Sequence, residues 1–125
     1  MEKIYTPKAP AAIGPYSQAV VTGGMVYSSG QIPIVPATGE LCTGDIREQS
    51  AQVMENLKAI LEAAGSGMEY IVKTTCLLAD IADFGAFNEV YASYIAHKPA
   101  RSCFAVKDLP KGAALEVEVI ALQKN

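Results

Sequence analysis

The sequence has few of the residues that most often build metal centres and nucleophilic triads. Its 125 residues contain one histidine, His97, and no C-x-x-C pair. A zinc site draws its ligands mainly from histidine and cysteine, and a Ser-His-Asp triad needs a histidine beside its nucleophile. We therefore expect no metal site. A dyad of Cys103 with His97 is a minor alternative, because His97 lies in a predicted loop.

Disulfides and membrane-spanning segments are also not indicated. The three cysteines, Cys42, Cys76 and Cys103, are an odd number set far apart, which suits reduced thiols better than a disulfide framework. No apolar run approaches the ~18 residues that a spanning helix needs. The first ten residues, MEKIYTPKAP, lack the apolar core of a signal peptide. We expect a cytoplasmic protein with no membrane partner.

Positive charge is scarce as well. Ten Lys and Arg residues stand against thirteen Asp and Glu residues, which gives a formal net charge of -3, and no basic run would follow a phosphate backbone. Nucleic acid is therefore an unfavoured partner. Half of the residues are apolar, and no repeat or linker-like stretch interrupts the chain. We expect one domain over residues 1–125 that buries a core without disulfides or metal.

The first half of the chain indicates strands followed by a helix. A short strand is expected near Ile4, and SQAVVT and MVYSS flank Gly23-Gly24 as in a β-hairpin. Pro33 and Pro36 then end regular pairing. A helix is predicted from Asp45 to Ala64, with a capping box of Asp45 and Glu48 at its start and Gly65 after its end. Its buried face comprises Ile46, Ser50, Val53, Leu57, Leu61 and Ala64.

The second half predicts strand, helix, strand, strand. YIVKTTCLLA reads as a strand and residues 81–96 as a helix with Phe84, Phe87, Tyr91 and Tyr94 on one face, and RSCFAV and ALEVEVIAL complete the sheet. This order predicts an α+β fold with both helices on one face of the sheet. In the last strand, Ile120 and Leu122 share the uncovered face with Glu116 and Glu118. An uncovered apolar face predicts an oligomer.

The segment PARSCFAV places an arginine inside an apolar strand. Alternation puts Arg101 and Cys103 on one face and Ser102, Phe104 and Val106 on the other, and we expect the second set to face the core. Pro99 is typical of an edge or a strand's first residue, so Arg101 should lie at a rim where a cleft could open. An arginine at a strand start is otherwise most often a solvated rim residue.

Four stretches together, APAAIGPYSQAV, SSGQIP, VKTTCLLADIADFGAFNEVY and PARSCFAV with LEVEVIA, closely resemble the Rid/YjgF family, specifically its RidA branch of imine deaminases. The resemblance implies a chorismate-mutase-like fold, with two helices packed on one face of a mixed sheet, and a homotrimer with clefts between neighbouring subunits. It further implies hydrolysis of 2-imino acids such as 2-iminobutanoate and 2-iminopropanoate to 2-keto acids and ammonia, without a cofactor.

The resemblance also implies roles for individual residues. The family's carboxylate-binding arginine, adjacent cysteine and water-orienting glutamate fall on Arg101, Cys103 and Glu116. Its other substrate-binding positions fall on Tyr16, Ser29, Gly30 and Asn88. One departure concerns the loop before PARS, which is several residues shorter than in the family and has Lys98 where an aromatic residue often precedes the proline. This departure bears on cleft shape and substrate range.

The chemistry of these residue types agrees with such a site. The planar guanidinium of Arg101 can donate two parallel hydrogen bonds to a carboxylate, and Glu116 can accept a proton from an attacking water. The alternative is an ion pair between Arg101 and Glu116, which would occupy the donors. Two other functions stay open: an endoribonuclease or translation inhibitor, as family members have been described, and a non-catalytic binder of small carboxylates that would tolerate loss of Glu116.

Overall fold

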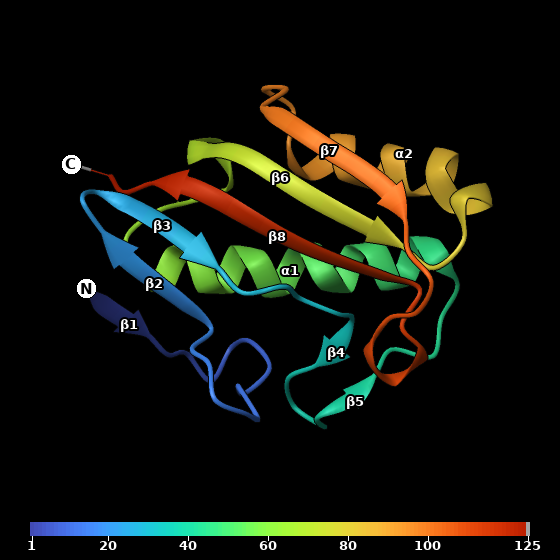
Figure 1. The fold of residues 1–125 in the computed structure, drawn as a ribbon, viewed down its shortest axis with the longest axis horizontal. Helices are drawn as coiled ribbons and strands as arrows, with labels where there is room; N and C mark the ends of the chain where they lie inside the picture. The colour runs from blue at the N-terminus through green and yellow to red at the C-terminus, as the bar shows by residue number, and fades with distance from the viewer. Residues whose placement is uncertain (125) are drawn as a thin grey trace.

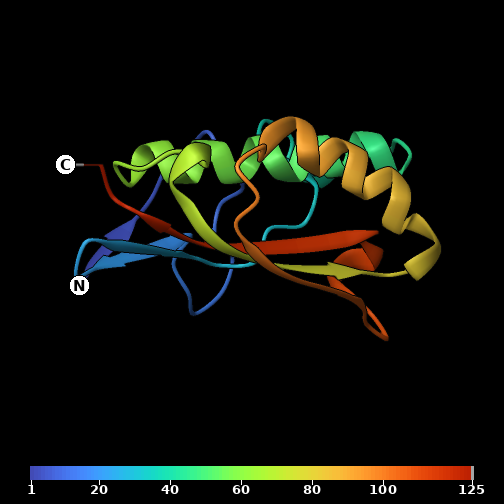
Figure 2. The same cartoon turned by 90° about the horizontal axis from the view of Figure 1, so that it is seen from above.

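The computed structural model describes residues 1–124 and consists of a mixed sheet with two helices on one of its faces (Figures 1 and 2). The strand order is β1-β2-β3-β8-β6-β7, antiparallel except for the parallel pair β6 and β7. The strands are β1 (Glu2–Ile4), β2 (Ala19–Thr22), β3 (Met25–Ser28), β6 (Ile71–Leu78), β7 (Ala100–Ala105) and β8 (Leu115–Leu122), and the helices are α1 (Ile46–Ala63) and α2 (Phe84–Tyr94). The predicted α+β architecture is confirmed.

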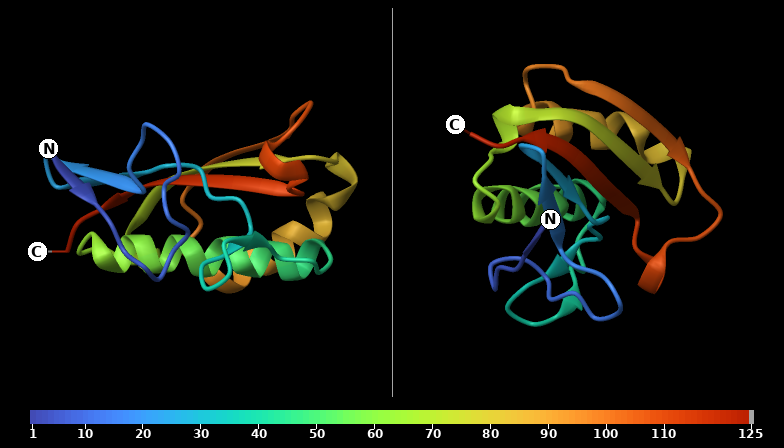
Figure 3. Two further views of the ribbon diagram at one scale, coloured as in Figure 1. Left: turned by 90° about the horizontal axis from the view of Figure 1, so that it is seen from below. Right: turned by 60° about the vertical axis from the view of Figure 1, so that its left-hand side comes forward.

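The β2–β3 hairpin forms where it was predicted. Thr22 pairs with Met25, and Gly23 and Gly24 both have positive φ, of 58° and 76°. Two successive left-handed residues match the twist of the flanking strands, which explains the glycine pair. The structure adds a second hairpin that the sequence did not predict, formed by β4 (Ile34–Val35) and β5 (Glu40–Leu41). It lies beside the loop that follows β1 (Figure 3).

The first helix has the expected ends. The Asp45 carboxylate accepts a hydrogen bond from the Glu48 N–H (3.0 Å), and Gly65 adopts φ 75° while the Ser66 N–H donates to the Leu61 carbonyl (2.8 Å). These contacts satisfy backbone groups that a helix end leaves unpaired. The second helix is shorter than predicted. Residues 81–83 form a separate 3₁₀ turn capped by Asp80, so α2 begins at Phe84.

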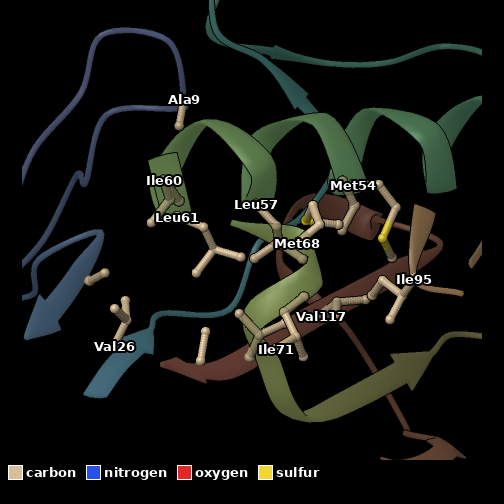
Figure 4. Packing of buried hydrophobic residues seen from close by; sticks show 14 of the residues in the cluster. Ala9, Val26, Met54, Leu57, Ile60, Leu61, Met68, Ile71, Ile95 and Val117 are labelled. Atoms are coloured by element: carbon tan, nitrogen blue, oxygen red, sulfur yellow. The ribbon is translucent and has the colours of Figure 1, made fainter. Parts of the chain in front are cut away.

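The core lies between α1 and the sheet (Figure 4). Val53, Leu57 and Leu61 from the predicted helix face are fully buried, and they meet Val26, Val117 and Val119 from the central strands. Ile95, just after α2, closes the same cluster. The core therefore follows the periodicity of the sequence on α1 and the alternation on β8.

The other face of the sheet is uncovered and partly apolar (Figure 3). Tyr27, Phe104 and Leu122 are each 41% to 49% exposed there, on β3, β7 and β8. One expectation for this face was wrong. Ser102 and Phe104 lie on the open face, while Arg101 and Cys103 face α2, because both faces of the edge strand β7 offer apolar neighbours and alternation alone does not tell them apart.

Within residues 1–124, the structure has no helix that is long and apolar enough to cross a membrane.

Candidate functional site

A cavity of about 490 Å³ opens at one end of the sheet. Its walls come from the loop before β2, the segment between β3 and β4, and the turn that precedes β8. Four predicted site residues line it together: Tyr16, Ser29, Gly30 and Glu116. The predicted residues Asn88, Arg101 and Cys103 are not among its lining. Within one protomer, the predicted site residues therefore form two separate clusters.

The loop that carries Tyr16 is anchored by buried hydrogen bonds. The amide of Gln18, only 2% exposed, accepts from the Thr6 N–H (2.7 Å) and donates to the carbonyls of Thr6 (3.0 Å) and Pro10 (2.8 Å). The Ser29 hydroxyl donates to the Ser17 carbonyl (2.5 Å). Ser29 thus fixes the loop, and its proton is not directed to the cavity. Tyr16 remains half exposed at the cavity edge.

Gly30 and Glu116 lie against each other in the cavity wall. Reciprocal backbone hydrogen bonds between Gln31 and Val117, of 2.8 and 3.0 Å, hold the two segments side by side. A Cβ atom at Gly30 would lie 2.8 Å from the carboxyl carbon of Glu116 and overlap one of its oxygens. The missing side chain therefore makes room for the Glu116 carboxylate.

Glu116 has the properties of a proton-transfer group. Burial, and secondarily the negative charge of Glu118, raises the pKa of its carboxyl. Burial disfavours the charged form, and a neighbouring carboxylate adds repulsion. Within residues 1–124, no Lys or Arg nitrogen lies within 4.0 Å of it. A raised pKa brings the group nearer to the pH at which it can both accept and return a proton.

The second cluster surrounds the half-buried Arg101 on the α2 side of the sheet. One guanidinium nitrogen donates to the Asn88 Oδ1 (2.7 Å). The guanidinium carbon lies 4.9 Å from the ring centre of Tyr91 and 5.5 Å from that of Phe84. Arg101 has no acidic partner within 4.0 Å in the part of the chain that the structure describes. Most of its five N–H donors are therefore free for a ligand.

The ion pair between Arg101 and Glu116 does not form within one chain. Leu77 of β6 pairs with Glu116 on one side and with Phe104 on the other. Three residues along β7 and two strand spacings then separate the Cα atoms of Arg101 and Glu116, which is roughly 14 Å. Their side chains also point to opposite faces of the sheet. The two proposed chemical groups face different surfaces of the protomer.

Cys103 is packed rather than activated. It lies beside Cys76 on the neighbouring strand, and burial raises the pKa of both thiols, that of Cys76 to about 12. A raised pKa lowers the fraction of reactive thiolate. The dyad with His97 does not form, because the His97 ring bonds the Ile71 carbonyl (2.8 Å), five strand residues or roughly 16 Å from the level of Cys103.

Some residues of both clusters were not predicted from the sequence to belong to the site. Lys111 and Pro110 line the cavity, and Phe84 and Tyr91 contact Arg101. Phe84, Asn88 and Tyr91 follow an i, i+4, i+7 spacing, a signal that predicts a shared helix face. Across residues 1–124, no group of three or more His, Cys, Asp or Glu side chains is placed to hold a metal ion.

Comparison with known proteins agrees with this arrangement of elements. The model of the family described as endoribonuclease L-PSP matches residues 6–123. The chain belongs to this Rid/YjgF family. A rat protein named 2-iminobutanoate/2-iminopropanoate deaminase is 50% identical over 121 residues, which cover 96% of this chain and 88% of the rat protein.

Two solved structures of Rid/YjgF proteins superpose closely on the fold. RidA from the Antarctic bacterium Psychrobacter sp. PAMC 21119 has a TM-score of 0.94 at 46% identity and covers 98% of this chain and 99% of its own. E. coli TdcF, solved with bound serine, has a TM-score of 0.93 at 44% identity, with 99% and 100% covered. The Rid/YjgF fold is therefore shared over almost the whole length of these chains.

Proposed function

We propose that this protein hydrolyses reactive 2-imino acids, such as 2-iminobutanoate and 2-iminopropanoate, to 2-keto acids and ammonia. The observation that carries the proposal is the pair of unneutralised groups, Arg101 and Glu116, one free to bind a carboxylate and the other to move a proton. The rat relative is named for this activity, and E. coli TdcF was solved with serine, a small molecule that carries a carboxylate.

The active unit is a homotrimer in this proposal, and each site lies between two copies. One copy supplies Arg101 with Asn88 and Cys103, and its neighbour supplies Glu116 with Tyr16, Ser29 and Gly30. The separation of the two clusters on opposite faces of the sheet supports this assignment. The exposed apolar residues Tyr27, Phe104 and Leu122 support burial of the open face against another copy.

The reaction needs few groups. Arg101 holds the substrate carboxylate, and the main chain at Cys103 borders the same strand edge. Glu116 accepts a proton from water while the water oxygen bonds to the imine carbon, and it then returns that proton to the imine nitrogen. The resulting carbinolamine loses ammonia as its C–O bond becomes the keto group, with Glu116 assisting proton transfer. Orientation of water beside the imine carbon accounts for much of the acceleration.

A coupled assay tests the proposal. A threonine dehydratase generates the imine, and its decay is followed with wild type, Arg101→Ala and Glu116→Gln. We expect wild type to accelerate the decay and both variants to lose most of that effect. Arg101→Ala should be worse, because it removes a charge-assisted contact with the carboxylate. Equal imine decay with and without wild-type protein would contradict the proposal.

The same variants separate the two alternatives. The description of the family names an endoribonuclease, and such an enzyme would cleave RNA with a strong salt dependence. RNA cleavage that survives Arg101→Ala would support that function. A non-catalytic carboxylate binder would need Arg101 and would bind 2-ketobutanoate equally well after Glu116→Gln, with no imine hydrolysis by wild type.

A further inference from the structure

Arg101 is held by aromatic side chains instead of by an acid. Its guanidinium carbon lies 4.9 Å from the Tyr91 ring centre and 5.5 Å from the Phe84 ring centre, and within residues 1–124 its side chain donates a hydrogen bond only to the neutral Asn88 amide. Contacts of this kind attract the cation to the negative face of the ring without cancelling its charge. The full positive charge therefore remains available to a ligand.

The geometry of α2 supplies these contacts together. Phe84, Asn88 and Tyr91 lie at i, i+4 and i+7, so their side chains form one stripe along the helix. That stripe faces β7 at the level of Arg101. Phe84 is 37% exposed and lies toward the outside, whereas Tyr91 is 8% exposed and lies toward the core. The two rings thus flank the guanidinium at different depths.

The inner ring is fixed by a buried hydrogen bond. The Tyr91 hydroxyl bonds the Thr74 hydroxyl (2.9 Å), and Thr74 is fully buried on β6. Thr74 is also the direct cross-strand partner of Arg101. The strand that positions Arg101 therefore also orients the ring that packs against it. This arrangement limits the rotamers that the long arginine side chain can adopt.

An acidic partner would hold the arginine equally firmly but would work against ligand binding. A carboxylate on Arg101 would occupy two parallel N–H donors and neutralise the charge. Aromatic rings attract the cation without placing an anionic acceptor on its N–H groups, so they leave its charge unneutralised. They also exclude water, which strengthens the attraction of the cation for an incoming carboxylate.

We propose that Phe84 and Tyr91 are positioning residues that hold Arg101 ready to bind the substrate carboxylate. The inference rests on the proposed function only in taking Arg101 as the carboxylate-binding group. The rings act through the arginine, so their removal should weaken binding of anionic ligands and leave binding of a neutral analogue unchanged. A ring that served only as a wall of the site would affect both kinds of ligand.

The test uses Phe84, because its exposure makes a folded variant the expected outcome. Binding of 2-ketobutanoate and of the neutral 2-ketobutanamide is measured by NMR titration of wild type, Phe84→Leu and Phe84→Tyr. We expect Phe84→Leu to weaken 2-ketobutanoate binding by about 2- to 5-fold. The affinity for 2-ketobutanamide should not change, and Phe84→Tyr, which keeps an aromatic ring, should retain the wild-type affinity for 2-ketobutanoate. In the imine assay, KM should rise by the same factor with kcat within about 2-fold.

Tyr70→Leu is the matched control. Tyr70 is also 37% exposed and has a cation, the Lys124 ammonium, 5.7 Å from its ring centre, but it lies in the 3₁₀ turn before β6 instead of beside Arg101. This variant should bind both ligands like wild type. Equal affinity for 2-ketobutanoate in Phe84→Leu and wild type would overturn the inference while leaving the deaminase proposal intact. A parallel loss of affinity for both ligands in Phe84→Leu would also overturn the inference. So would a wild-type protein that binds 2-ketobutanoate no more tightly than 2-ketobutanamide, whatever the imine assay shows.

Discussion

Gly30 has its place beside Glu116 because it has no side chain. Its φ is not in the left-handed region, so alanine is compatible with the backbone there. The added Cβ would instead displace the Glu116 carboxylate. We expect Gly30→Ala to lower kcat for imine hydrolysis by about 10- to 100-fold, because a shift of about 1 Å in a reacting group can cost that much. KM should change little, since Arg101 is untouched.

The control for this prediction is Gly85→Ala. A Cβ at Gly85 meets nothing within 4 Å, and its backbone is helical, so this variant should keep wild-type rates. Circular dichroism confirms that both variants are folded. A Gly30→Ala protein with an unchanged kcat would show that the position of Glu116 does not limit the reaction.

The raised pKa of Glu116 makes a second prediction, on stability. A carboxyl whose folded-state pKa is raised stabilises the fold below the pKa of the unfolded chain and loses that contribution as pH rises through the folded-state pKa. Glu116→Gln removes this titration. We expect the variant to melt at a higher temperature than wild type at pH 7, and the difference to shrink toward about pH 4. Calorimetry at both pH values measures the difference in melting temperature between variant and wild type. A difference that is smaller at pH 7 than at pH 4 would contradict the raised pKa of Glu116.

Single residues show why the site was only partly predictable. The resemblance to a family indicated Gly30 as a substrate-binding position but did not indicate that its missing side chain makes room for Glu116. Its contact with Glu116 depends on the Gln31 and Val117 pairing, which brings together residues far apart in the sequence. Spacing along the chain contains no information on that contact.

At the scale of elements, features encoded by local sequence were predicted well. The α1 ends follow from Asp45 and Gly65, and the β2–β3 turn follows from two adjacent glycines, because these residues act through their own backbone. The β4–β5 hairpin was missed. Its strands have two residues each, too short for alternation to be visible.

The strand β7 illustrates the limit of alternation. The pattern separated Arg101 and Cys103 from Ser102 and Phe104 correctly, but the faces were assigned the wrong way round. An apolar residue such as Phe104 usually faces a core. Here it lies on the open face, 49% exposed, while the arginine packs on aromatic rings of α2. Alternation determines which residues share a face, and only the tertiary structure determines what covers it.

At the scale of the whole molecule, the proposed reaction depends on two protomers sharing each site. The open face, predicted from Ile120 and Leu122 beside Glu116, is present in the structure, and its cover by other copies stays a prediction. In the proposed homotrimer, head-to-tail interfaces close a ring, so each copy would offer its Arg101 cluster to one neighbour and its Glu116 cluster to the other. No single chain then needs to bring the two clusters together.

Subunit complementation tests this central claim most directly. Arg101→Ala and Glu116→Gln proteins, each expected to retain little activity in the imine assay, are unfolded, mixed in equal amounts and refolded together. In randomly mixed rings, one interface in four joins an intact Arg101 cluster to an intact Glu116 cluster, so the account predicts recovery of about a quarter of wild-type activity. Each variant refolded alone should stay inactive. A mixture that regains no activity, although the wild-type protein refolds to full activity in the same way, would contradict a site shared between subunits.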